Sequence, residues 1–211
     1  MTQRRRNKIK SQSLLIGSFL ILIGISLIFI DWYKDYRKQI NDNKAVDLFF
    51  EEDVISTDIV DTQKEENKTN EEKIIENYIA VLEIPKISFK RGLYAIDSDK
   101  NNVNYNVEIL QNSDMPDVEN GNFVLAGHSG SGYTAFFNKL DKLVVGDESY
   151  VYYNKEKYKY KITKIYEIEK TGTATITRNK DKNVLTMVTC SQTKDDKQIV
   201  IISELVDKES Y

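Results

Sequence analysis

Hydrophobic and polar positions divide this chain into three stretches. Residues 11–30 form one uncharged run dominated by Leu, Ile and Phe, whereas residues 31–77 are polar and acidic with sparse apolar positions. From residue 78 onward, short apolar or alternating runs are separated by turn signals. About 20 apolar residues at roughly 1.5 Å each match a hydrocarbon core of about 30 Å, so the first stretch predicts a transmembrane helix. The third stretch predicts a strand-rich domain.

The strand-rich stretch predicts a mostly β fold that follows the transmembrane helix. One amphipathic helix is expected at 134–143, where apolar residues recur at helical spacing. The segment Asn154-Lys155-Glu156 separates two predicted strands and has the composition of a hairpin turn. The expected architecture is a closed or nearly closed barrel with one or two short helices. The predicted strands are 78–84, 103–110, 122–126, 149–153, 157–169, 184–190 and 199–205.

A basic segment precedes the uncharged run. Residues 1–10 hold five Arg or Lys side chains and no acidic one. Positive flanks stay cytoplasmic, so the chain after Asp31 is expected outside the cell. The alternative is a cleaved signal peptide, whose apolar region would run about 7–15 residues and end at a small-x-small cleavage site. The run here is longer and exits into Asp31-Trp32-Tyr33, with an aromatic pair suited to the membrane interface, which favours an uncleaved anchor.

Charge separates the remainder of the chain from the anchor. Beyond the first 30 residues there are 25 basic against 33 acidic side chains, a net charge of −8. This excess argues against nucleic acid as a partner, and against anionic lipid headgroups as a partner of the outer domain. The acidic stretch is interpreted as a spacer, with a docking segment at 48–50 as the alternative. The expected organisation is a cytoplasmic tail (1–10), an anchor (11–30), an extracellular stalk (31–77) and a folded catalytic domain (78–211).

The candidate chemistry rests on two residue types that each occur once. Cys190 ends the apolar run 184–190, and His128 follows the predicted strand 122–126 and Gly127. A lone cysteine cannot close an intramolecular disulfide. A free cysteine is only a few per cent thiolate at pH 7; a nearby imidazolium favours the thiolate and can protonate a departing amine. The alternative is a buried cysteine that only packs and a histidine that is satisfied in its loop.

Motif detail favours the catalytic interpretation. The run Thr186-Met187-Val188-Thr189-Cys190 resembles, without gaps, the Thr-Leu-x-Thr-Cys signature of sortases, the cell-surface transpeptidases of Gram-positive bacteria. Met187 stands in the leucine place and keeps an apolar side chain of similar volume. Gly127-His128-Ser129 resembles the family's histidine segment, and 84–87 and 112–116 are similar to its early strand and the loop before the histidine strand. The resemblance covers about 78–206 and is typical of classes A and D.

The resemblance implies a closed eight-stranded sortase-like β-barrel and an acyl transfer reaction. Cys190 would attack the Thr–Gly bond of a Leu-Pro-x-Thr-Gly-like sorting signal, and His128 would act as general acid and then as base. The implied partners are secreted proteins with a C-terminal sorting signal, an amine from a cell-wall precursor or a pilin lysine, and the lipid bilayer around the N-terminal helix. No cofactor is expected. Some members bind calcium, but the acidic residues here are too dispersed to assign a metal site. The segment 167–183 is similar to the loop that reads the sorting signal.

One departure from the family pattern concerns its third catalytic group. Sortases place an arginine at the start of the strand after the cysteine, and no arginine follows Cys190 here. Counting back from Ser203-Glu204-Leu205, which resembles the family's strand end, puts Gln198 in the arginine place with Lys197 beside it. A glutamine amide donates a hydrogen bond without charge, and a lysine lacks the planar fork of arginine. Four interpretations remain open at this point. The protein is an active enzyme with a substitute donor, a weakly active or inactive relative, an anchored cysteine peptidase or a non-catalytic binding module.

Overall fold

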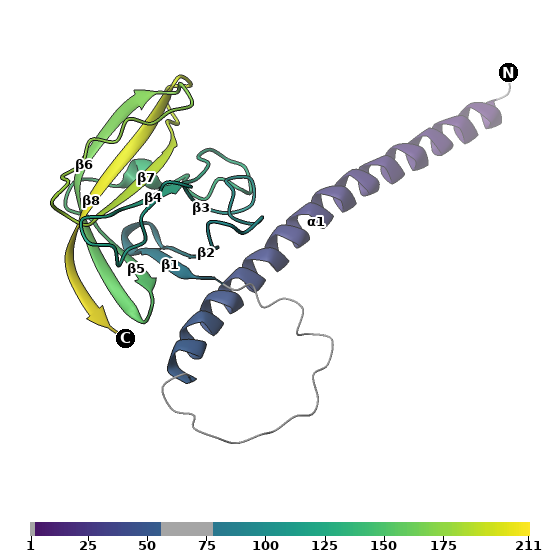
Figure 1. Ribbon diagram of the computed structural model, residues 1–211. Coiled ribbons are helices and arrows are strands. Elements are labelled where there is room, and N and C mark those ends of the chain that lie inside the picture. The colour runs from purple at the N-terminus through teal and green to yellow at the C-terminus, as the bar shows by residue number, and fades with distance from the viewer. Residues whose placement is uncertain (1–2, 56–77) are drawn as a thin grey trace. The chain divides into compact units, whose positions relative to one another are not determined.

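The computed structural model describes residues 3–55 and 78–211 (Figure 1). One long helix, α1 (Gln3–Ile55), precedes a β-rich domain. The chain divides into two compact units, Met1–Asn41 and Asp42–Tyr211, so the last turns of α1 belong to the same unit as the strands.

The first unit is helical throughout its described part. Most large apolar side chains between Phe19 and Ile30 are exposed, each by at least 42%. Within residues 3–55 and 78–211, no helix combines the length and the apolar character needed to cross a membrane. The transmembrane helix predicted at 11–30 therefore gains no support from this finding and stays a prediction. The predicted tail 1–10 and stalk 31–77 each lie partly outside the described residues.

Eight strands in the described part of the second unit form one sheet, and the expectation of a mostly β fold is confirmed. The strand order is β2-β1-β5-β6-β8-β7-β4-β3. Because β2 and β3 end this order without pairing to each other, the barrel is nearly closed, which corrects the closed barrel that the family resemblance implied. The strands are β1 (Ala80–Ile84), β2 (Phe89–Leu93), β3 (Glu108–Ile109), β4 (Asn122–Ala126), β5 (Glu148–Tyr153), β6 (Glu156–Glu169), β7 (Val184–Cys190) and β8 (Lys197–Ser210).

The strands that carry the candidate chemistry match their predicted bounds, and others differ. β4 and β7 coincide with the predicted 122–126 and 184–190. β2 was not predicted, because Lys90-Arg91-Gly92 interrupts any apolar alternation. The hairpin turn between β5 and β6 is confirmed: Asn154 and Lys155 have φ of 54° and 60°, the left-handed pair that suits a two-residue hairpin.

The expectation of one or two short helices in the barrel domain is confirmed, but the amphipathic helix placed at 134–143 is wrong in its extent. Only two short 3₁₀ turns occur among residues 78–211, η2 (Pro85–Ile87) and η3 (Leu140–Lys142). The backbone N–H of Phe137 donates to the carbonyl of His128 at 2.9 Å rather than to a residue four positions back. This contact holds the loop next to β4. The regularly spaced apolar residues of the loop pack into the core instead of forming one face of a helix.

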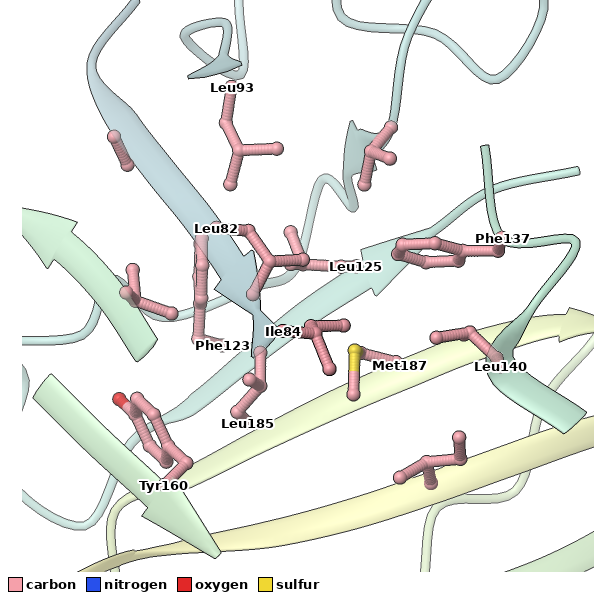
Figure 2. Packing of buried hydrophobic residues seen from close by; sticks show 14 of the residues in the cluster. Leu82, Ile84, Leu93, Phe123, Leu125, Phe137, Leu140, Tyr160, Leu185 and Met187 are labelled. Atoms are coloured by element: carbon pink, nitrogen blue, oxygen red, sulfur yellow. The ribbon is translucent and has the colours of Figure 1, made fainter. Parts of the chain in front are cut away.

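The barrel interior is one apolar core (Figure 2). Strand residues such as Leu82, Leu125 and Leu185 are fully buried in it. Phe137 and Leu140 bring the loop after β4 into the same core (Figure 2). At about 25 cal/mol per Å², burial of each such side chain contributes about 1.5–3 kcal/mol. The core therefore holds the loop that begins at His128.

The end of α1 packs on the barrel within the second unit. Ala45 and Val46 are buried in a cluster with Tyr78, Val81 and Tyr94. The described residues 42–50 are thus a helix with one packed face, while the stalk expected at 31–77 and the docking alternative at 48–50 stay predictions. In the sequence, apolar residues at helical spacing within this acidic segment are the signal that could have predicted a packed helix.

Candidate active site

His128 and Cys190 are brought to one rim of the barrel by two neighbouring strands. β4 and β7 lie side by side (Figure 1) and pair in parallel, and Ala126 is opposite Val188 in their register. The backbone N–H of Gly127 extends this pairing by donating to the Val188 carbonyl at 3.2 Å. Parallel strands end on the same side of a sheet, so the histidine that follows β4 and the cysteine that ends β7 share that side.

Strand alternation places Cys190 on the outer face of the sheet. Leu185 and Met187 of β7 point into the barrel core, whereas Val184 and Val188 belong to a separate cluster on the outer face. Because side chains alternate along a strand, Cys190 shares the outer face with Val188. The outer apolar cluster consists of Val184, Val188, Val200 and Ile202, with Tyr166, Ile168 and Ile176 packed against it.

Two hydroxyl groups lock the histidine segment to the cysteine strand. The buried Thr189 Oγ1 donates to the Gly127 carbonyl at 2.8 Å, and Ser129 Oγ donates to the Cys190 carbonyl at 2.6 Å. Each hydroxyl comes from one segment and binds the backbone of the other. The two bonds flank the His128–Cys190 pair and fix the separation of their backbones.

The imidazole has a partner that the sequence did not predict. Nε2 of His128 lies 3.2 Å from Oδ1 of Asn104, in the loop between β2 and β3. An amide oxygen accepts, so this contact favours a proton on Nε2. His128 and Cys190 are both partly exposed, which leaves them accessible to a substrate. The asparagine-rich loop signals turns, but nothing in the sequence marks Asn104 over its neighbours.

The register of β8 separates the two candidates for the arginine place. Gln198 lies directly opposite Cys190 and, by alternation, on the same outer face. Lys197 lies one residue earlier and therefore on the other face, where its ammonium pairs with Glu169. The hydrogen bond that the Lys197 ammonium donates to Glu169 raises the pKa of Lys197 above its usual value. Lys197 is thus engaged away from the thiol, and Gln198 is the side chain adjacent to it.

The loop between β6 and β7 lies against the outer face. Ile176 of this loop packs on the outer apolar cluster, and the Tyr166 hydroxyl binds the loop backbone at Thr175 and Thr177. Arg178 Nη1 donates to the carbonyl of Asn120 at 3.0 Å. The loop is thereby placed beside the strands that end at Cys190.

Comparison with known proteins identifies the family of the chain. The sortase domain model matches residues 82–206, which is more than half of the chain. The chain belongs to the sortase family. This sortase is 26% identical to sortase A of Bacillus anthracis over 203 residues, covering 91% of this chain and 93% of that protein. Membership makes it a cysteine transpeptidase enzyme of the cell-wall anchoring type.

Solved sortase structures share the fold. A sortase D5 transpeptidase of Clostridium perfringens superposes with a TM-score of 0.55 at 24% identity, covering 80% of this chain and 98% of that one. Sortase C1 of Streptococcus agalactiae gives a TM-score of 0.55 at 27% identity, covering 63% of this chain and 69% of that one. These likenesses place the sortase in the fold shared by several classes.

The Thr189 hydroxyl offers a matched test of the lock between the two segments. In Thr189→Val the Gly127 carbonyl loses its buried donor, and a buried polar group without a partner costs about 1–3 kcal/mol. We expect lower thermal stability and a lower kcat. Thr186→Val is the control, since that hydroxyl binds the Asn122 side chain and lies three residues from Thr189, on the other face of β7. A larger loss of kcat in Thr186→Val than in Thr189→Val would contradict the role given to Thr189.

Proposed function

We propose that this sortase cleaves a Leu-Pro-x-Thr-Gly-like sorting signal between Thr and Gly through a thioacyl intermediate on Cys190. The observation that carries the proposal is the parallel pairing of β4 and β7, whose ends bring His128 and Cys190 to the same rim. Both residues stand within the motifs that resemble the family's catalytic segments.

The proposed reaction has two acyl transfers. The Cys190 thiolate attacks the threonine carbonyl carbon, the C–N bond to glycine breaks, and the His128 imidazolium gives its proton to the departing amine. An incoming amine then attacks the thioester carbon, passes a proton to neutral His128 and releases the thiolate as the C–S bond breaks. The bond from the His128 ring to Asn104 fixes the orientation of the imidazole for both proton transfers.

We assign substrate recognition to the outer face beside Cys190. The partly buried residues Tyr166, Ile168 and Ile176, which pack on the outer apolar cluster, provide apolar surface on this face. A leucine and a proline of a sorting signal suit such a surface, and the neighbouring loop 167–183 supplies polar groups. The acceptor amine is that of a cell-wall precursor or a pilin lysine, and the substrates are secreted proteins that carry the signal at their C-terminus.

We propose that residues 11–30 anchor the sortase in the cell membrane with the N-terminus in the cytoplasm. Sortases are typically membrane-anchored extracellular enzymes. The support in this chain is the uncharged run itself, the basic residues before it and the exposed apolar side chains from Phe19 to Ile30. Alkaline carbonate extraction of membranes from cells that express the full chain tests the anchor, and release of the chain into the soluble fraction would refute it.

A peptide library tests the proposed substrate. The full chain, purified in detergent, is incubated with peptides that vary each position of the Leu-Pro-x-Thr-Gly signal, and the products are identified by mass spectrometry. We expect cleavage after threonine, strongest when leucine and proline are both present. Equal cleavage of scrambled peptides would indicate a general peptidase, and no cleavage by wild type would indicate an inactive relative.

Alanine variants of Gln198 and its neighbour Lys197 test which side chain takes the role of the missing arginine. The Gln198 amide is positioned to donate to an oxyanion or a substrate carbonyl beside Cys190, and loss of one such donor costs about 10²–10³ in rate. We expect Gln198→Ala to lower kcat by about that factor, while Lys197→Ala, which removes a side chain engaged with Glu169, changes kcat less than about twofold.

The Gln198→Arg variant decides whether Gln198 replaces the family's arginine adequately or whether the protein is a deficient relative. If the Gln198 amide is an adequate donor, kcat of the variant stays within about tenfold of wild type, because one donor replaces another. A gain of about 10²-fold or more would instead identify the natural protein as a deficient relative.

A further inference from the structure

Arg91 is a largely buried cation on an edge strand of the barrel. Its side chain is 13% exposed, although it lies on β2, which ends the sheet. Three groups from three different segments surround the guanidinium. Its Nη2 lies 3.1 Å from Oδ2 of Asp42, its Nε donates to Oδ1 of Asn106, and its central carbon lies 3.7 Å from the centroid of the Phe136 ring.

Two of these partners lead to His128 by short paths, each along the chain and then through one hydrogen bond. Asn106 follows Asn104 by two residues in a turn in which both Tyr105 and Asn106 donate backbone N–H groups to the Asn102 carbonyl, and Asn104 contacts the imidazole. Phe136 is bonded to Phe137, whose backbone N–H donates to the His128 carbonyl. The segments that contact the ring and the backbone of His128 therefore meet at Arg91.

The third partner comes from the end of α1. The Asp42 side chain is 11% exposed, so the ion pair with Arg91 is shielded from water on both sides. A buried charge that loses its partner is strongly unfavourable, and the freed group must move toward water. Burial of the nearby Ala45 and Val46 holds Asp42 in place within the second unit. The helix end thus fixes the position of the guanidinium.

We propose that Arg91 and Asp42 are a positioning pair for His128, so that residues 42–50 of α1 are part of the support of the active site. Arg91 touches neither substrate nor thiol; it clamps Asn106 and Phe136 and thereby the two segments around the imidazole. This inference rests on the proposed function for its kinetic consequence only. The geometry at His128 is measurable without any substrate.

The test compares Asp42→Asn with a matched control on the same strand. Lys90 neighbours Arg91 and lies 4.4 Å from the Phe50 ring of α1, but it contacts neither Asn106 nor Phe136. We expect Asp42→Asn to lower kcat by about five- to thirtyfold with KM within about twofold, as for a network that acts through another residue. Lys90→Gln should stay within about twofold of wild type in both.

Two further variants separate positioning from folding. Phe136→Leu keeps an apolar side chain but removes the ring face under the guanidinium, and should lower kcat with little change in the melting temperature. Arg91→Lys keeps the charge beside Asp42 but cannot also reach Asn106 through a planar fork, and should retain only part of the rate of wild type. If both variants keep the wild-type kcat, the proposal is overturned.

The ring resonances of His128 distinguish a positioning role of Arg91 and Asp42 from a purely structural one. Because the chain has one histidine, its imidazole gives a single set of ring resonances in the full chain in detergent micelles. We expect these resonances to shift in Asp42→Asn and Phe136→Leu and to stay in place in Lys90→Gln. Unshifted resonances in Asp42→Asn would overturn the proposal even if kcat fell. If wild type cleaves no sorting peptide, the proposed function fails, and the resonances still decide this inference.

Discussion

Cys190→Ala should reduce cleavage and transfer to background. Cys190 is the chain's only thiol, so no other cysteine can take over as nucleophile. In acyl-transfer enzymes the loss of the nucleophile lowers kcat by on the order of 10⁶. The substitution removes one sulfur from a partly exposed position at the end of β7, so the fold should be retained.

The measurement is product formation from a sorting peptide, with the melting temperature as the control for folding. Alkylation of wild type by a thiol reagent gives a second control, because it modifies Cys190 alone and should abolish turnover at one reagent per chain. Retention of more than about 1% of the wild-type kcat in Cys190→Ala would exclude the thioacyl route.

His128→Gln should lower kcat by about 10²–10⁴, the usual contribution of a general acid and base. A glutamine amide can still donate to Asn104 but cannot exchange a proton near neutral pH. Thiol attack then proceeds without a proton for the leaving amine. Steady-state kcat with a sorting peptide is the measurement that checks this prediction.

Ser131→Ala is the control for this second prediction, because Ser131 lies in the same loop and is exposed. Its kcat should stay within about twofold of that of wild type. An unchanged kcat in His128→Gln would assign the proton transfers to another group and would remove His128 from the mechanism.

The sequence predicted the parts of the fold that depend on local pattern. Continuous apolar runs marked β4 and β7 with their correct bounds, and the Asn-Lys turn marked the hairpin between β5 and β6. β2 was missed because its residues pair with β1 without apolar alternation. The loop at 134–143 was mistaken for a helix because inward packing of the loop and a helix share the same apolar spacing.

The candidate site was predictable as residue types but not as geometry. The unique His128 and Cys190 stand in recognisable motifs, and β-strand register then separates Gln198 from Lys197. Asn104 and the pair of Arg91 with Asp42 depend on contacts between segments far apart in the chain. A single sequence gives no signal for such contacts, since polar residues in loops and on helix ends are common.

The central claim is that Cys190 carries the acyl group from a sorting signal to an amine. Intact mass spectrometry of the full chain, mixed with a sorting peptide and sampled with and without an added amine, tests it most directly. The account predicts a covalent adduct on Cys190 equal to the peptide up to threonine, which disappears as the amine-linked product forms. Hydrolysis that is indifferent to the amine, or turnover with no adduct on Cys190, would contradict it.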